Sequence, residues 1–297
     1  MRKKITYRIL FLFLIIIFIF SFLSFKEKIN DIISQKQIKK PFSKIDKDKI
    51  IKIVLDNENK KIEIYKKNNH WYIKKDNFDF KADEERIKKT IDALINIRKE
   101  EIISENKNNH KKFGIDKKKI NFYTNKDKFK IYVGNEVNFS NNYVRINDEN
   151  TIFLAENLND VFLNNDWRDL KVRLINKQEE INYLEINYFN KGKSLKLLKE
   201  KNDWKINGKK TKNNLISFFI NDLFVLKAED ILTQDNIDLK FPEIDIKIKE
   251  NNQIKKADLF INNQDYYLLK IKNNKLIYKI KKTDLPYLEK DIEEFIE

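Results

Sequence analysis

The chain has 297 residues, of which 41% are hydrophobic, so it is long enough for two domains with cores of their own. It contains no cysteine, two histidines and four glycines, which excludes disulfides and thiolate metal sites and leaves glycine-rich phosphate loops without their glycines. The formal charge is +15, but only 7 of the 61 basic residues are arginine, the side chain that nucleic-acid interfaces favour. Together with 38 asparagines, this indicates AT-rich codon usage, and we expect no nucleic acid as a partner.

The first predicted element is a membrane anchor. A basic tail, residues 1–8, precedes a lipophilic run that begins at Ile9 and ends at Phe25 (residues 9–25). As a helix this run spans about 26 Å, which is at the short end of what crosses a bilayer. A cleaved signal peptide is the alternative, but no small-x-small cleavage site follows the run.

We therefore expect a single-pass signal anchor that lies in the lipid bilayer of the cytoplasmic membrane. The order of basic tail, apolar run and long polar body favours a cytoplasmic N-terminus and an extracytoplasmic body, although lysines on both sides of the run leave the orientation open. Residues 26–46 are predicted to form a stalk. Its helical spacing suggests that the anchor helix continues to about Lys40, where Pro41 ends it.

From Ile50 onward most segments alternate apolar and charged residues, as at Ile62 and Ile64. This period of two is typical of strands with one buried face and predicts mostly antiparallel sheets. In two segments the apolar residues recur every 3.6 residues instead, which predicts helices. Their apolar stripes are Ile87, Ile91, Leu94 and Ile95 after a candidate N-cap, Asp83, and Leu215, Phe218, Phe219, Ile220, Leu223 and Phe224 after Thr211.

These landmarks occur twice. Trp71, in a short strand before the first helix, matches Trp204, 133 residues later and before the second helix. So long a repeat indicates a domain duplication. We expect an α+β fold of two tandem modules, residues 47–170 and 171–297, each a mostly antiparallel sheet with one main helix and a closing helix near 157–163 or 284–296. Trp71 and Trp204 are expected at equivalent core positions, with stacking on sugars as the alternative.

In the order of its anchor, strands, helices and short motifs, the chain resembles the domain-of-unknown-function family numbered 4340, over about residues 50–295. One departure is Lys117, where the family often has a proline soon after the aspartate. The resemblance implies a membrane-anchored envelope protein of undetermined activity, encoded beside ABC transporters of the gliding-motility type. The matching motifs are Trp71-Tyr72-Ile73, Ala82-Asp83, Phe113-Gly114-Ile115-Asp116, Ile131-Tyr132-Val133-Gly134, Tyr143-Val144 and Trp167-Arg168-Asp169.

No group of residues predicts catalysis. His70 and His110 lack metal-ligand spacing, and close carboxylate pairs are expected by chance among 46 acidic residues. We therefore expect no catalytic residue, cofactor or metal, and a hydrolase built only on carboxylates is the remaining enzyme hypothesis.

The sequence favours a non-enzymatic accessory protein of an ABC-type transport or envelope complex. Binding of anionic wall or surface polymers by the lysine-rich body is the alternative. Arg168, Asp169 and Arg173 are the candidate partner surface, because they include two of the few arginines and lie where the two copies meet. Arg168 and Asp169 could also form an ion pair, either buried or exposed.

Overall fold

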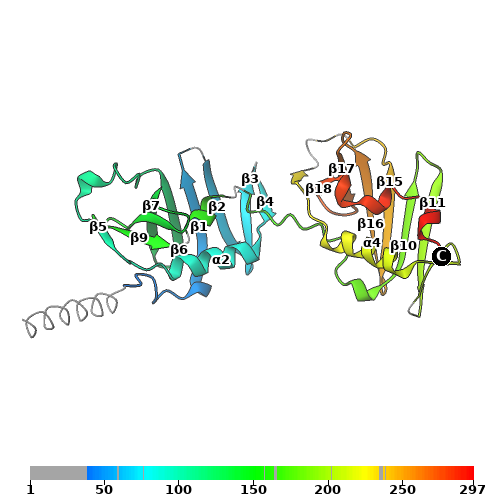
Figure 1. The fold of residues 1–297 in the computed structure, drawn as a ribbon, viewed down its shortest axis with the longest axis horizontal. Helices are drawn as coiled ribbons and strands as arrows, with labels where there is room; N and C mark the ends of the chain where they lie inside the picture. Colours follow the sequence, from blue (N-terminus) through cyan, green and yellow to red (C-terminus); the bar gives the residue numbers. More distant parts are fainter. Residues whose placement is uncertain are drawn as a thin grey trace, which may run out of the picture. The chain divides into compact units, whose positions relative to one another are not determined.

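The computed structural model describes residues 39–297 except 59, 76, 157, 164–165, 202, 234–236 and 238. The predicted anchor and most of the predicted stalk, residues 1–38, lie outside the described residues. Among the residues that are described, no helix is long and apolar enough to cross a membrane. The chain divides into two compact units, a first module that ends at Asp169 and a second module, Leu170–Glu297 (Figure 1).

The first module is a nine-stranded sheet with the order β4-β3-β2-β1-β6-β7-β8-β9-β5. Helix α2 (Glu84–Ile95) lies across one face of this sheet, and a short helix, α3 (Asn159–Leu163), follows the last strand. The strands are β1 (Ile50–Asn57), β2 (Lys60–Lys67), β3 (His70–Lys75), β4 (Phe78–Lys81), β5 (Ile102–Ser104), β6 (Lys118–Thr124), β7 (Lys128–Glu136), β8 (Asn141–Ile146) and β9 (Ile152–Glu156).

The second module repeats this strand order as β13-β12-β11-β10-β15-β16-β17-β18-β14. Every pairing between neighbouring strands in both sheets is antiparallel, so the prediction of two mostly antiparallel sheet modules is confirmed. The elements are β10 (Ile181–Tyr188), β11 (Lys193–Glu200), β12 (Asp203–Ile206), β13 (Lys209–Lys210), α4 (Asn213–Val225), β14 (Asp230–Thr233), β15 (Ile244–Glu250), β16 (Gln253–Ile261), β17 (Tyr266–Ile271) and β18 (Leu276–Lys281).

Helix α2 begins where its local sequence predicts. The Asp83 carboxylate accepts a hydrogen bond from the Arg86 backbone N–H at 3.1 Å, which satisfies one of the donors left free at a helix start. Ile87, Ile91 and Leu94 are buried on the sheet, and each such side chain contributes about 1.5–3 kcal/mol of hydrophobic stabilisation.

Helix α4 differs from its prediction in the side chains that it buries. Lys212 occupies its N-cap position, and the hydroxyl of the preceding Thr211 donates to the Trp204 carbonyl at 2.8 Å. Phe218 and Phe224, which the sequence placed on the apolar stripe, are 57% and 42% exposed. The buried stripe, Ile216, Phe219, Ile220 and Leu223, already fills the face that touches the sheet, so these two rings point elsewhere.

Residues 39–46, which the sequence assigned to the stalk, pack on the first module instead. The Lys99 backbone N–H donates to the Lys39 carbonyl at 3.0 Å. Phe42 is only 2% exposed, and its ring lies 5.1 Å from that of Phe122, edge to face. The apolar side chain of Phe42 therefore completes the core of this module.

The expected closing helices differ between the modules. In the first module α3 forms, whereas residues 282–295 of the second module form three short 3₁₀ turns: Lys282–Asp284, Pro286–Leu288 and Ile292–Phe295. Pro286 has no N–H to donate to a preceding turn, so a continuous helix cannot run through it.

The two matching tryptophans lie at the same place in the two strand orders. Trp71 is the second residue of β3 and Trp204 the second residue of β12, and they are 8% and 5% exposed. Their cross-strand neighbours also correspond, since Lys66 faces Trp71 and Lys199 faces Trp204. The two tryptophans therefore occupy equivalent, largely buried positions in the two modules.

Candidate functional site: a basic pocket and an apolar groove

The Trp-Arg-Asp motif belongs to a segment that closes the first module, residues 166–169, here called the closing segment. It pairs with the chain between β4 and α2. The Asp83 N–H donates to the Trp167 carbonyl at 2.9 Å, and the Asp169 N–H donates to the Lys81 carbonyl at 2.8 Å. The closing segment therefore lies beside the first turn of α2.

Arg168 and Asp166 form a bidentate ion pair within this segment. Arg168 Nε lies 2.9 Å from Asp166 Oδ1, and Nη2 lies 2.5 Å from Oδ2. The side chain of Arg168 is only 5% exposed and that of Asp166 is 31% exposed. Burial alone would raise the pKa of Asp166, but the hydrogen bonds and charge of Arg168, with a smaller effect of Lys75, outweigh it and hold this pKa below its usual value.

The indole of Trp167 is fixed between the sheet and α2. The Arg86 guanidinium stacks 3.8 Å from the centre of the ring and also donates to the Asp166 carbonyl at 2.7 Å. Burial lowers the pKa of Arg86, although neighbouring carboxylates oppose this shift and an arginine stays charged. Trp167 is 1% exposed, and its Nε1–H finds no hydrogen-bond acceptor among the described groups.

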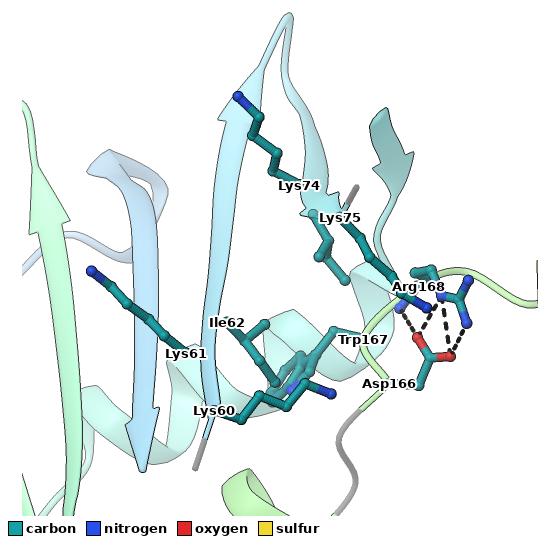
Figure 2. A pocket seen from close by; sticks show the side chains of 9 residues that line it. Lys60, Lys61, Ile62, Lys74, Lys75, Asp166, Trp167 and Arg168 are labelled. Atoms are coloured by element: carbon teal, nitrogen blue, oxygen red, sulfur yellow. Dashed lines mark hydrogen bonds and ion pairs between the residues drawn. The ribbon is translucent and has the colours of Figure 1, made fainter. Parts of the chain in front are cut away.

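A pocket of about 240 Å³, here called the first-module pocket, opens at this point between β2, β3 and the closing segment. Figure 2 shows the Lys60 side chain beside Trp167 and the Lys75 side chain extending toward Asp166, whereas Lys61 and Lys74 point away. These directions follow from strand alternation, because residues two apart share a face of the sheet and adjacent residues do not. The residues that line the first-module pocket are Lys60, Lys61, Ile62, Ile73, Lys74, Lys75, Asp166, Trp167 and Arg168.

The second module closes in the same way but without the two arginines. The Lys212 N–H donates to the Phe295 carbonyl at 2.9 Å, so Phe295 corresponds to Trp167 and the next residue, Ile296, to Arg168. Counted from the N-cap of each helix, Leu215 corresponds to Arg86. The carboxylate is kept, since Glu294 corresponds to Asp166, so the fold can be closed without the two arginines of the first module.

The hairpin that carries Lys75 is also specific to the first module. Six residues, 74–79, separate the paired Ile73 and Phe80, whereas only Asn207 and Gly208 separate the paired Ile206 and Lys209. The longer hairpin is what brings the Lys75 ammonium to the closing segment.

A second hollow, here called the α4 groove, lies in the second module between α4 and residues 171–176. Its volume is about 490 Å³. Phe224 and Val225 of α4 are 42% and 54% exposed, which is unusual for side chains of this kind on a helix whose other face is buried. Its lining is Lys171, Val172, Arg173, Ile175, Asn176, Phe224, Val225 and Lys227.

The three residues proposed as a partner surface have different surroundings, each within its own module. Arg168 is buried, and its charge pairs with Asp166 within the first module. The backbone of Asp169 helps to close the first module. Arg173 is exposed and lines the α4 groove.

The two histidines have structural surroundings. The exposed His70 ring lies 2.9 Å from a Glu84 carboxylate oxygen, and the buried His110 ring lies 2.9 Å from the Asn150 carbonyl. In the part of the chain that is described, no three His, Asp or Glu side chains gather in a way that could hold a metal ion.

The Phe-Gly-Ile-Asp motif supports the sheet. Gly114 has a φ of +68°, a backbone conformation that glycine adopts without strain. A Cβ on Gly134 would lie 2.3 Å from the Phe113 carbonyl oxygen, which the Asn135 N–H contacts at 2.9 Å. This motif therefore docks a loop closely onto β7.

A family model described as a domain of unknown function, DUF4340, matches residues 71–245, which is more than half of the chain. The chain belongs to this family. The DUF4340 match begins at Trp71 in β3 and ends in β15, so it runs through the closing segment and across the boundary between the two modules. No curated protein and no solved structure matches the chain.

Sequence reasoning missed the first-module pocket because its residues come from three distant segments. The sequence signal that could have pointed to this region is the rarity of arginine, since Arg86 and Arg168 are two of only seven arginines in the chain.

Proposed function

We propose that this DUF4340 protein works by binding and not by catalysis, as an accessory protein of an ABC-type transport or envelope complex. In this proposal residues 9–25 hold it in the cytoplasmic membrane and the two modules lie outside. The same strand order in both modules supports an origin by tandem duplication. The transporter as partner rests on the gene neighbourhood typical of the family.

The observation that carries the proposal is the α4 groove. Counted from the N-caps, Phe218 corresponds to Lys89 of α2, and Val225 corresponds to Asn96. The exposed face of α2 is thus polar, whereas that of α4 carries apolar side chains. Solvent-exposed rings of this kind, surrounded by polar residues, are typical of protein–protein contacts.

The charges around the groove indicate what it would contact. Lys171, Arg173 and Lys227 line it together with Phe224 and Val225. A partner surface with apolar side chains and acidic neighbours would complement both features. A subunit of the transport complex with such a surface is therefore the expected partner.

The test is crosslinking in native membranes, followed by identification of the captured subunits. Replacing Phe224 and Val225 together by serine should abolish capture of transporter subunits. The matched control replaces Lys88 and Lys89, an adjacent exposed pair on α2, by serine and should leave capture unchanged. Equal capture by both variants would contradict the α4 groove as the contact surface, and robust hydrolytic turnover that survives a chelator would contradict a binding function.

Binding of anionic polymers is the second candidate, and the exposed lysines of β2 and β3 favour it. Lys61 and Lys74 point away from the first-module pocket into solvent. Contacts of this kind are screened by salt. Polymer binding that falls steeply between 50 and 300 mM salt (roughly tenfold or more) would support this candidate, and retention that ignores salt would exclude it.

A further inference from the structure

We propose that one face of the first sheet, here called the tyrosine face, is a binding site for an extended anionic polysaccharide. The acid groups of the polymer would contact two lysines, and its hydroxyls would contact tyrosine phenols. The proposal rests on the second candidate function, polymer binding, and is independent of the α4 groove. The rings that define the tyrosine face are Tyr65, Tyr72, Tyr123 and Tyr132.

The tyrosine face lies opposite the core. Core side chains of the strands, such as Ile53 and Ile64, pack with the buried stripe of α2, so their neighbours along each strand point the other way. All four tyrosine rings on that side are partly exposed. Lys61 and Lys74 belong to the same side and turn away from the first-module pocket in Figure 2.

Strand register arranges this face in rows. The longest row crosses β3, β2, β1, β6 and β7. Neighbouring strands lie about 4.8 Å apart, so this row extends over about 19 Å. Such a length suits several units of a polymer better than a single small molecule. The residues of the row, in order, are Tyr72, Tyr65, Lys52, Tyr123 and Lys128.

Two lysines of the tyrosine face are held in place by its rings. Lys128 Nζ lies 5.4 Å from the centre of the Tyr123 ring, and Lys119 Nζ lies 5.3 Å from the centre of the Tyr132 ring. Within the described part of the chain, neither lysine forms an ion pair. Their charges are therefore positioned and open to an anion.

Other charges on this face are largely compensated. Lys52 Nζ lies 2.6 Å from a Glu63 carboxylate oxygen, and Lys130 Nζ lies 3.6 Å from one of Asp148. Asp56 faces a lysine on each neighbouring strand, so it can offset only one of them. An excess of positive charge remains, which complements an acidic polymer.

The ring faces distinguish a polysaccharide from a single-stranded nucleic acid. Tyr123 lies between two lysines, from β1 and β7. Tyr132 lies between a lysine of β6 and Arg145, whose guanidinium is 3.6 Å from the ring centre. Proteins that bind single-stranded nucleic acid stack its bases on free aromatic faces, and cations already occupy these faces.

The phenol hydroxyls are what the rings offer instead. That of Tyr65 is hydrogen-bonded to Asp79, which together with burial raises the pKa of Tyr65 to about 12. Those of Tyr72, Tyr123 and Tyr132 bond no described residue. A phenol can donate and accept a hydrogen bond, so phenols beside ammonium groups match the hydroxyls and carboxylates of an acidic sugar.

The second module provides an internal comparison. The matching pairs Lys66–Trp71 and Lys199–Trp204 align the two sheets. The positions of Tyr65, Tyr72, Tyr123 and Tyr132 are held there by Leu198, Lys205, Lys249 and Asp258, and those of Lys119 and Lys128 by Asp245 and Ile254. The same strand order thus forms without these rings and lysines.

The experiment measures binding of the full chain, in nanodiscs of phosphatidylcholine, to polygalacturonate by calorimetry. Every unit of this polymer carries a carboxylate and hydroxyls. The wild-type chain should bind it saturably and should not bind dextran, which has hydroxyls but no charge. Polyglutamate, which has carboxylates but no hydroxyls, should bind at least about threefold more weakly.

Two sets of variants locate the site. Lys119→Gln with Lys128→Gln should weaken polygalacturonate binding by about tenfold. The matched control, Lys249→Gln with Lys256→Gln on the corresponding face of the second module, should change it by less than about twofold.

The phenols are tested by the combined variant Tyr72→Phe, Tyr123→Phe and Tyr132→Phe. It should weaken polygalacturonate binding by about fivefold and leave polyglutamate binding unchanged. The midpoint of urea unfolding checks that each variant is folded.

The outcomes separate the site from the function. Equal losses in the two lysine variants would overturn the tyrosine face as the site and leave polymer binding in place, whereas a wild-type chain that binds no polygalacturonate would overturn both. Tighter binding of single-stranded poly(dT), or a phenylalanine variant that binds as the wild-type chain does, would overturn the choice of a polysaccharide. Capture of transporter subunits should be the same in all these variants.

Discussion

Removing either member of the Arg168–Asp166 pair should destabilise the first module, but to unequal extents. Asp166→Asn removes the bidentate ion-pair partner of the Arg168 guanidinium, which is 5% exposed, and breaking a buried ion pair in this way costs about 3–5 kcal/mol. Arg168→Met leaves a carboxylate that is 31% exposed and can recover water, so the loss should be about 1.5–3 kcal/mol. The Asp166 variant should therefore be the less stable of the two.

The assay is urea unfolding at pH 7, followed by the fluorescence of Trp71 and Trp167. The control is Lys47→Met, which removes an exposed pair with Asp92 in the same module and should change stability by less than about 0.5 kcal/mol.

The pH dependence provides an independent check. Because the folded-state pKa of Asp166 is below its ordinary value, its ionised form favours the folded state. This stabilisation is complete above the unfolded pKa of about 3.9 and is lost as the pH falls through the lower folded pKa. The difference between the wild-type chain and Arg168→Met should therefore shrink below pH 4. An Asp166→Asn variant as stable as the wild-type chain would refute the reasoning. So would a stability difference between the wild-type chain and Arg168→Met that is the same at pH 7 and pH 3.

Three further predictions concern the two cores. Gly134→Ala should cost about 1–3 kcal/mol, because its Cβ would meet the Phe113 carbonyl oxygen, and an unchanged urea midpoint would contradict this. Trp71→Ala and Trp204→Ala should each cost about 3–5 kcal/mol and lower only the unfolding transition of their own module in calorimetry. Burial raises the pKa of Tyr188 to about 12, so the folded state favours its neutral form and stability should fall as the pH rises from about 10 to about 12. In urea unfolding measured at a series of pH values, Tyr188→Phe should reduce this loss of stability.

Local patterns predicted the elements whose causes are local. Asp83 caps α2 because a carboxylate at that position accepts a hydrogen bond from the N–H three residues later, which is a local contact. Alternation likewise predicted strands with one buried face. Phe42 shows the limit of such reasoning, since only the core of the first module reveals that a residue next to Pro41 is buried.

The pairing of Arg168 with Asp166 has a simple physical cause. In an extended chain, residues two apart share a face. Asp166 therefore lies beside Arg168. The exposed rings of α4 escaped prediction because apolar side chains lie on more than one face of this helix, so its sequence does not reveal which face meets the sheet.

The pocket could not be predicted because it depends on the closing segment. Lys60, Lys75, Arg86 and Trp167 come from segments that meet only when residues 166–169 pair with the chain before α2. Nothing in their spacing along the sequence indicates this contact.

The most direct test of the binding function is a photo-crosslinking side chain placed at Val225 of the full chain in native membranes. We predict crosslinks to a subunit of an ABC-type transporter, which disappear when Arg173→Glu or Phe224→Ser is added. The same probe at Lys89 of α2 should give none. Products that are identical from both positions, or that survive both added substitutions, would contradict the account.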